Sequence, residues 1–132
     1  MIEEKITAYF RNQKEVVSVY LYGSYASGQN RAFSDIDLGV LFAGGDKDTI
    51  DARLSQYLGD LTEVLRKDIH LTCMNYASEG LLKQIFKKGR CILVADQKRL
   101  TYFKMVAFSR IADFGFYLKQ MQAGLICRVK EG

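Results

Sequence analysis

The chain has 132 residues, of which 48% are hydrophobic and 26% charged, and it carries a formal net charge of +4 at neutral pH. This length and composition predict one globular domain over residues 1–132. They exclude a membrane protein, because no stretch approaches the roughly 20 uncharged apolar residues of a membrane-spanning helix. The positive charge suits an anionic ligand, whether a nucleotide, a nucleic acid or an acidic protein surface, and does not choose between them. Direct nucleic-acid binding is not indicated.

The N-terminal residues give no sign of a signal peptide. A signal peptide begins with basic residues followed by an apolar run, whereas this chain has Glu3, Glu4 and Lys5 near its start. A cytoplasmic location is therefore expected.

Hydrophobic spacing in the first third of the chain predicts one helix and two strands. Residues 2–13 place apolar side chains at helical spacing, and residues 16–22 are β-branched and aromatic, as in a strand. A second strand is predicted over residues 35–42. Only a loop joins the two strands, which favours antiparallel pairing between them.

The remaining chain continues this alternation of helices and strands. In order, we expect a helix over 48–65, a strand over 68–74, a helix over 79–88, a strand over 91–95 and a long helix over about 98–128. Asp46 or Asp48 is the expected N-cap of the first of these helices, and Ser78 that of the second.

This element order predicts an α/β (α+β) fold with a mixed sheet of about four strands flanked by helices. We expect the helices to cover one face of the sheet. Residues 1–95 then form the core, and the last helix carries more large side chains than its core stripe needs. A partner interface and a wide core stripe explain these side chains equally well.

Two aspartates at the start of the second strand are the first candidate site residues. Side chains alternate along a strand, so Asp35 and Asp37 point to the same face, separated by roughly 6.6 Å of backbone rise. Two carboxylates so close repel one another unless a cation lies between them, and oxygen ligands suit Mg²⁺ or Mn²⁺. Alternatively, Asp35 caps a turn and Asp37 is solvated.

A glycine pattern before these aspartates suggests an anion site. Gly23 and Ser24 follow the first strand, and Gly28 follows five residues later, so the backbone there is able to approach a phosphate closely. A triphosphate bound to Mg²⁺ needs an anion site and a cation site side by side. Together the two motifs favour nucleotide chemistry.

These residues resemble a known family. Gly23-Ser24, Gly28 and Ser34-Asp35-Ile36-Asp37-Leu38 are similar to the signature of the nucleotidyltransferase superfamily typified by DNA polymerase β. The small size resembles the MntA-like minimal nucleotidyltransferases, the antitoxins that pair with HEPN-domain toxins. The segment NYASEGLLKQIFKKGRCIL also resembles that family, so the likeness covers roughly residues 1–95.

The resemblance implies transfer of AMP from ATP to a hydroxyl of the HEPN toxin, a tyrosine by family likeness, with metals held by Asp35, Asp37 and a third carboxylate. It also implies nucleotide binding by Gly23, Ser24, Gly28 and Ser34. His70 stands where the family has its third aspartate. Asp68, two residues earlier, is the first choice for that ligand and His70 the second, with a general-base or structural role also open to the histidine.

Three functions are thus in view for this chain. The first is an antitoxin that adenylylates its toxin, with Mg²⁺ or Mn²⁺ as cofactor and ATP as substrate. The second is an antitoxin with impaired catalysis that neutralises the toxin by binding alone. The third is a nucleotidyltransferase that modifies a small molecule or a nucleic acid.

Overall fold

The computed structural model describes residues 2–23 and 35–111, and these residues build a four-stranded sheet in the order β3-β2-β1-β4. Strand β1 (Val16–Tyr22) pairs antiparallel with β2 (Ile36–Phe42) and with β4 (Arg90–Val94). Strand β2 pairs parallel with β3 (Ile69–Cys73). The sheet is therefore mixed, which confirms the predicted fold class.

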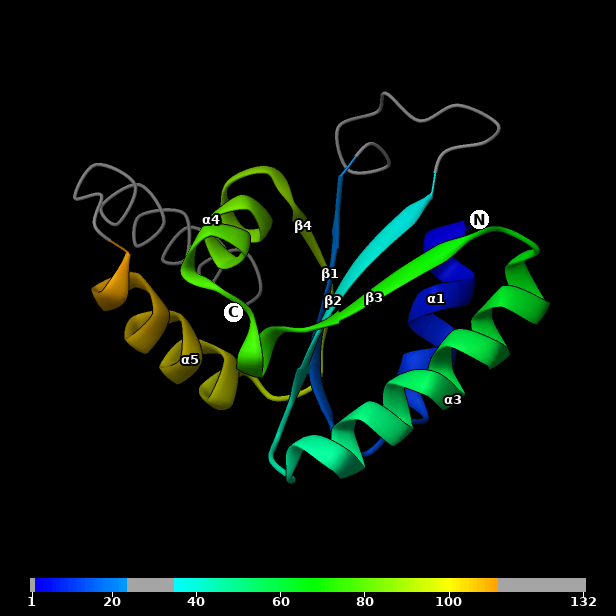
Figure 1. The fold of residues 1–132 in the computed structure, drawn as a ribbon, viewed down its shortest axis with the longest axis horizontal. Coiled ribbons are helices and arrows are strands. Elements are labelled where there is room, and N and C mark those ends of the chain that lie inside the picture. The colour runs from blue at the N-terminus through cyan, green and yellow to red at the C-terminus, as the bar shows by residue number, and fades with distance from the viewer. Residues whose placement is uncertain (1, 24–34, 112–132) are drawn as a thin grey trace.

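Helices cover both faces of the sheet, so the expectation of a single covered face is wrong (Figure 1). Helices α1 (Ile2–Arg11) and α3 (Lys47–Leu65) pack on one face, and α4 (Glu79–Lys88) and α5 (Gln97–Arg110) pack on the other. Strand β1 explains this arrangement, because all seven of its residues are buried. A strand that is apolar on both sides has to be covered on both sides.

Each face has its own apolar core. Val19 and Leu21 of β1 join the cluster beneath α1 and α3, whereas Tyr20 and Tyr22 join the cluster beneath α4 and α5. Gly39 of β2 lets the second layer approach closely. A Cβ atom at that position would lie 3.2 Å from the Met74 side chain and 3.3 Å from Ile85.

Side-chain caps set the helix boundaries, as the sequence predicted. The Asp46 carboxylate accepts a hydrogen bond from the Thr49 amide at the start of α3, and the Ser78 hydroxyl accepts one from the Leu81 amide at the start of α4. Helix α5 ends at Arg110, because Ile111 has extended backbone angles. The prediction of one uninterrupted helix over about 98–128 is therefore wrong at Ile111, and its continuation over 112–128 lies outside the described residues.

A short 3₁₀ helix, η1 (Met74–Tyr76), links β3 to α4 and is fastened to the sheet by one side chain. The Asn75 amide group donates to the Phe42 carbonyl at 3.0 Å, and its oxygen accepts from the Phe42 amide at 2.9 Å. These two bonds fix the end of β3 against the end of β2. Within the described ranges, no helix has the length and apolarity needed to cross a membrane.

Candidate active site

The candidate site lies at the edge of the sheet where β1 ends and where β2 and β3 begin (Figure 1). Asp35 directly precedes β2, and Asp37 is its second residue. Ile36 and Leu38, between and after the two aspartates, are completely buried in the core. This alternation turns both carboxylates to the other side of the strand, as predicted.

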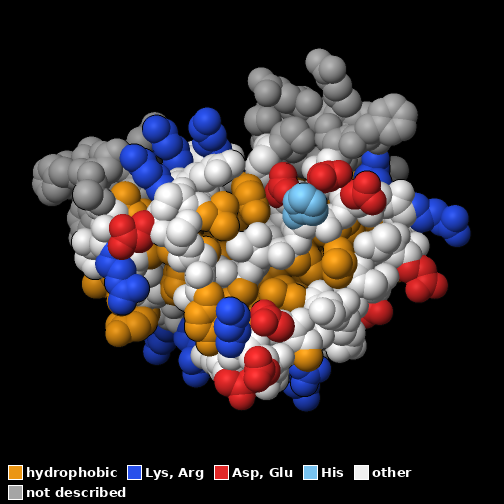
Figure 2. All heavy atoms as spheres, in the orientation of Figure 1, with side chains coloured by type: hydrophobic (Ala, Val, Ile, Leu, Met, Phe, Trp, Pro, Cys, Tyr) orange, Lys and Arg blue, Asp and Glu red, His pale blue; other side chains and the backbone are white. Residues whose placement is uncertain are grey.

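His70 stands between the two carboxylates. The parallel register pairs it directly with Asp37 across β2 and β3. Its Nε2 atom lies 3.5 Å from Asp35 Oδ2, and its Nδ1 atom lies 3.6 Å from Asp37 Oδ1. Figure 2 shows the chain's single histidine on the surface with acidic side chains on either side of it.

The two aspartates differ in their surroundings. The Asp37 side chain is 26% exposed and that of Asp35 is 42% exposed. Burial raises the pKa of Asp37 above the ordinary aspartate value, His70 opposes this shift and the charge of Asp35 adds to it. A bound cation would therefore stabilise the charged form of the partly buried Asp37 carboxylate more than that of the more exposed Asp35.

Gly23 makes room for Asp37. Its φ of +74° lies in the left-handed region that residues with a side chain rarely adopt. A Cβ atom on Gly23 would also lie only 2.3 Å from Asp37 Oδ2. The sequence predicted a glycine here for close approach to a phosphate, and the structure adds a second reason, because the Asp37 carboxylate occupies that space.

A contact that the sequence analysis missed lies beside this cluster. The Tyr22 hydroxyl and Thr72 Oγ1 are 3.1 Å apart, so one donates a hydrogen bond to the other and ties β1 to β3 across β2. Tyr22 is the register partner of Asp37, and Thr72 follows His70 on the same face of β3. Thr72 lies two residues after His70, so strand alternation could have predicted from the sequence that the two side chains share one face.

Asp68 occupies a different position from His70. Asp68 precedes β3 and is exposed to solvent. Its backbone carbonyl accepts a hydrogen bond from the Ile36 amide at 3.0 Å. The charges that act on Asp37 are those of His70 and Asp35. The described residues thus bring together Asp35, Asp37, His70 and Gly23, while the predicted nucleotide-binding residues Ser24, Gly28 and Ser34 lie outside the described part of the chain.

The carboxylate pair fits a divalent cation. Mg²⁺ in nucleotide sites is usually held by one or two carboxylates together with substrate phosphates and water. Asp35 and Asp37 offer such oxygens on one side of β2, and both reach solvent. In the part of the chain that the structure describes, no three His, Cys, Asp or Glu side chains converge on one metal position. The cation therefore fits here together with the phosphates of a bound nucleotide.

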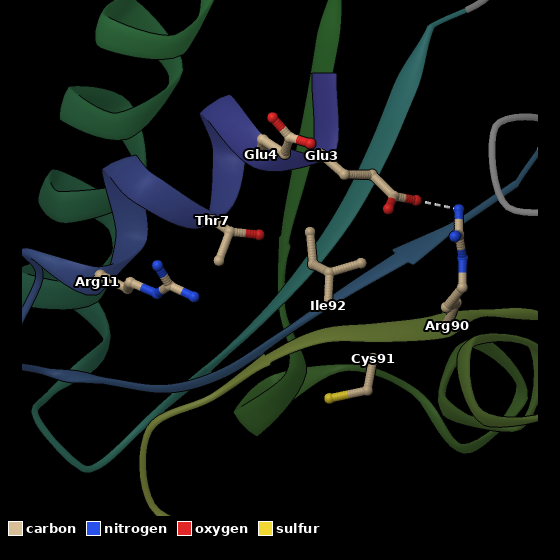
Figure 3. A pocket seen from close by; sticks show the side chains of 7 residues that line it. All are labelled: Glu3, Glu4, Thr7, Arg11, Arg90, Cys91 and Ile92. Atoms are coloured by element: carbon tan, nitrogen blue, oxygen red, sulfur yellow. Dashed lines mark ion pairs between the residues drawn. The ribbon is translucent and has the colours of Figure 1, made fainter. Parts of the chain in front are cut away.

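A separate cavity of about 460 Å³ lies between α1 and β4 (Figure 3). Glu3 and Arg90 form an ion pair at its rim, and Thr7, Arg11 and Ile92 also line it. None of the predicted site residues contributes to this cavity. The chemistry suggested by the sequence thus lies at the carboxylate pair and not in this hollow.

The structure thus has a mixed sheet with two carboxylates at the start of one strand, opposite a glycine at the end of its antiparallel neighbour, which agrees with the resemblance to nucleotidyltransferases. The family description "Polymerase beta, Nucleotidyltransferase" matches residues 4–98 of the chain. The chain therefore belongs to this nucleotidyltransferase family, and the resemblance inferred from its motifs is confirmed.

The proteins similar to the chain include a curated relative and two solved structures. The protein adenylyltransferase MntA of Shewanella oneidensis is 34% identical over 90 residues, which cover 67% of this chain and 62% of the relative. A crystal structure of a toxin-antitoxin with AMP-PNP superimposes with a TM-score of 0.67 at 27% identity, covering 98% of this chain and 99% of that chain.

The second structure is a tri-AMPylated HEPN toxin of Shewanella oneidensis in complex with its MNT antitoxin. It matches with a TM-score of 0.61 at 25% identity, over 98% of this chain and 96% of that chain. The likeness to both structures extends along nearly the whole chain. The curated MntA is matched over less than two thirds of its own length.

Proposed function

We propose that this protein transfers AMP from ATP to a tyrosine hydroxyl of a cognate HEPN-domain toxin and thereby acts as its antitoxin. The observation that carries this proposal is the pair of carboxylates, Asp35 and Asp37, turned to one side of β2 beside the left-handed Gly23. Since ATP is an intracellular metabolite, the proposal also assigns the protein to the cytoplasm.

The similar proteins support this choice of reaction and partner. The curated relative is named a protein adenylyltransferase, one matched structure is a toxin-antitoxin with AMP-PNP, and the other contains an AMPylated HEPN toxin. ATP is therefore the proposed substrate, and Mg²⁺ or Mn²⁺ the proposed cofactor.

In the proposed reaction, the acceptor oxygen forms a bond to the α-phosphorus of ATP. The bond from that phosphorus to the pyrophosphate oxygen breaks, pyrophosphate leaves and the hydroxyl proton passes to solvent. The cation, when bound, neutralises charge on the transferring phosphoryl group and lowers the pKa of the acceptor hydroxyl.

The residues of the chain position these groups. Asp35 and Asp37 would hold the cation, and either Asp68, just before β3, or His70, within β3, would complete their site. Gly23 and Ser24 are proposed to bind the β- and γ-phosphates through backbone amides and a hydroxyl, and Gly28 and Ser34 are proposed to contribute to nucleotide binding. The protein would accelerate the reaction mainly by holding the nucleotide in line with the acceptor hydroxyl.

Intact mass spectrometry tests the proposal. The protein is incubated with the HEPN-domain protein encoded beside it, ATP and Mg²⁺ or Mn²⁺, and both proteins are weighed. We expect the mass of AMP to be added to the partner by the wild type and by Glu63→Gln, which removes an exposed carboxylate of α3. Asp35→Asn should add none, and equal addition by Asp35→Asn would contradict the metal assignment.

A second function, neutralisation by binding alone, is favoured by one observation on α5. Tyr102 and Met105 project from this helix three residues apart and are 71% and 52% exposed, as a partner-binding surface would be. In this case the same mass experiment gives no AMP, and a stable complex with the partner survives Asp35→Asn but is weakened by Tyr102→Ala. Size-exclusion chromatography measures that complex.

A further inference from the structure

His70 occupies the position at which the resemblance implies a third carboxylate. Its two ring nitrogens face Asp35 Oδ2 at 3.5 Å and Asp37 Oδ1 at 3.6 Å. The register between β2 and β3 fixes this placement, because Asp37 and His70 are paired residues of the sheet. A cation held by both aspartates would therefore lie beside the imidazole.

The distances leave the imidazole available to a cation. Both contacts are longer than usual nitrogen–oxygen hydrogen bonds. As the side chains stand, Asp35, Asp37 and His70 do not converge on one metal position. The His70 side chain is 67% exposed, however, so it can turn about its own torsions to direct one nitrogen at a cation held by the carboxylates. A metal-bound histidine generally donates its other ring N–H to a carboxylate, and here an aspartate stands on each side of the ring.

An imidazole changes which cation the site prefers. Magnesium favours oxygen ligands, whereas nitrogen from histidine suits manganese and other transition metals better. We propose that His70 is a ligand of the site's divalent cation and that it shifts the preference of the site from Mg²⁺ toward Mn²⁺. This inference depends on the proposed function only in that a cation binds at Asp35 and Asp37.

The single histidine of the chain makes the ligand directly observable. The pulsed electron paramagnetic resonance spectrum of bound Mn²⁺ shows modulation from a nitrogen that is coordinated to the metal. We expect this modulation in the wild type, a changed pattern when the histidine is labelled with heavy nitrogen, and its loss in His70→Asp. Mn²⁺ bound without nitrogen modulation would overturn the proposal.

Calorimetric titration with Mn²⁺ and with Mg²⁺, each with a non-hydrolysable ATP analogue, tests the preference. We expect His70→Ala to weaken Mn²⁺ binding by roughly tenfold or more. His70→Asp should bind Mg²⁺ more tightly relative to Mn²⁺ than the wild type does. Unchanged relative affinities in His70→Asp, or a larger loss of Mn²⁺ affinity in Asp68→Ala than in His70→Ala, would contradict the assignment.

Two control variants separate failure of this inference from failure of the proposed function. Asp35→Asn should abolish binding of either cation, and Glu63→Gln should bind both as the wild type does. If Asp35→Asn binds Mn²⁺ normally, the carboxylate site itself is wrong. If Asp35→Asn loses the cation while His70→Ala keeps it, the carboxylate site stands and the role of His70 is refuted.

Discussion

Replacement of Gly23 by alanine should damage the site, because the added methyl group meets the Asp37 side chain. The new Cβ atom would lie 2.3 Å from Asp37 Oδ2, 3.2 Å from Asp37 Cγ and 3.4 Å from Asp37 Cβ. The Asp37 carboxylate group therefore has to move. The backbone at residue 23 also has to keep a φ of +74°, which disfavours any residue with a Cβ atom.

The magnitudes follow from these two effects. A left-handed residue with a side chain costs about 1–2 kcal/mol, and for a chain of this size such a loss lowers Tm by roughly 3–10 °C. Displacement of a metal-holding carboxylate by an ångström costs on the order of 100-fold in rate. We therefore expect Gly23→Ala to fold, to unfold at lower temperature and to lose nearly all AMP transfer.

Gly44→Ala is the matched control for this experiment. Gly44 lies in the turn after β2, and no atom stands within 4 Å of the position of an added Cβ. Thermal unfolding and AMP transfer to the partner are measured for both variants. Wild-type transfer by Gly23→Ala would refute the argument that this glycine keeps space for Asp37.

Three further predictions concern stability. Burial raises the pKa of Asp37, His70 lowers it, and the charge of Asp35 raises it further, so that the folded-state pKa lies above the ordinary value. The protonated Asp37 therefore stabilises the fold in acid, and this stabilisation is lost as the pH rises through the folded-state pKa. Asp37→Asn should therefore have a higher Tm than the wild type at pH 7, with the difference shrinking below about pH 4; a lower Tm at pH 7 would contradict this. Gly59 lies inside α3 with open space around it, so Gly59→Ala should raise stability by about 1 kcal/mol in urea unfolding, and a loss would show a hidden contact. The hydroxyl of the fully buried Tyr57 donates a hydrogen bond to the Glu15 carboxylate. Tyr57→Phe should therefore lower the free energy of unfolding by about 2 kcal/mol, and an unchanged urea midpoint would show that this bond is not stabilising.

Local patterns in the sequence were enough to predict the four strands, the approximate positions of the α-helices up to residue 110, and the carboxylate pair. Strand alternation alone turns Asp35 and Asp37 to one side, since Ile36 and Leu38 must be buried. The helix caps are likewise local. Ser78 was predicted correctly, and Asp46 was one of the two predicted candidates for the other cap.

Features that depend on packing between elements could not be predicted in the same way. The position of His70 beside Asp37 depends on the register of two parallel strands separated by α3, and sequence periodicity does not set that register. The second covered face was signalled by the continuous apolar run of β1, which indicates a strand buried on both sides. Gly23 makes room for Asp37 of the neighbouring strand, and the sequence alone does not show which residues meet across two strands.

The most direct test of the central claim follows each phosphate of ATP separately. The protein and its HEPN-domain partner are incubated with ATP labelled at the α-phosphate or, in a parallel reaction, at the γ-phosphate. If Asp35 and Asp37 support AMP transfer, the α-label appears on the partner, the γ-label is released as pyrophosphate, and both Asp35→Asn and Asp37→Asn transfer nothing. Label from the γ-phosphate on the partner, or α-label transferred equally by the two variants, would contradict the account.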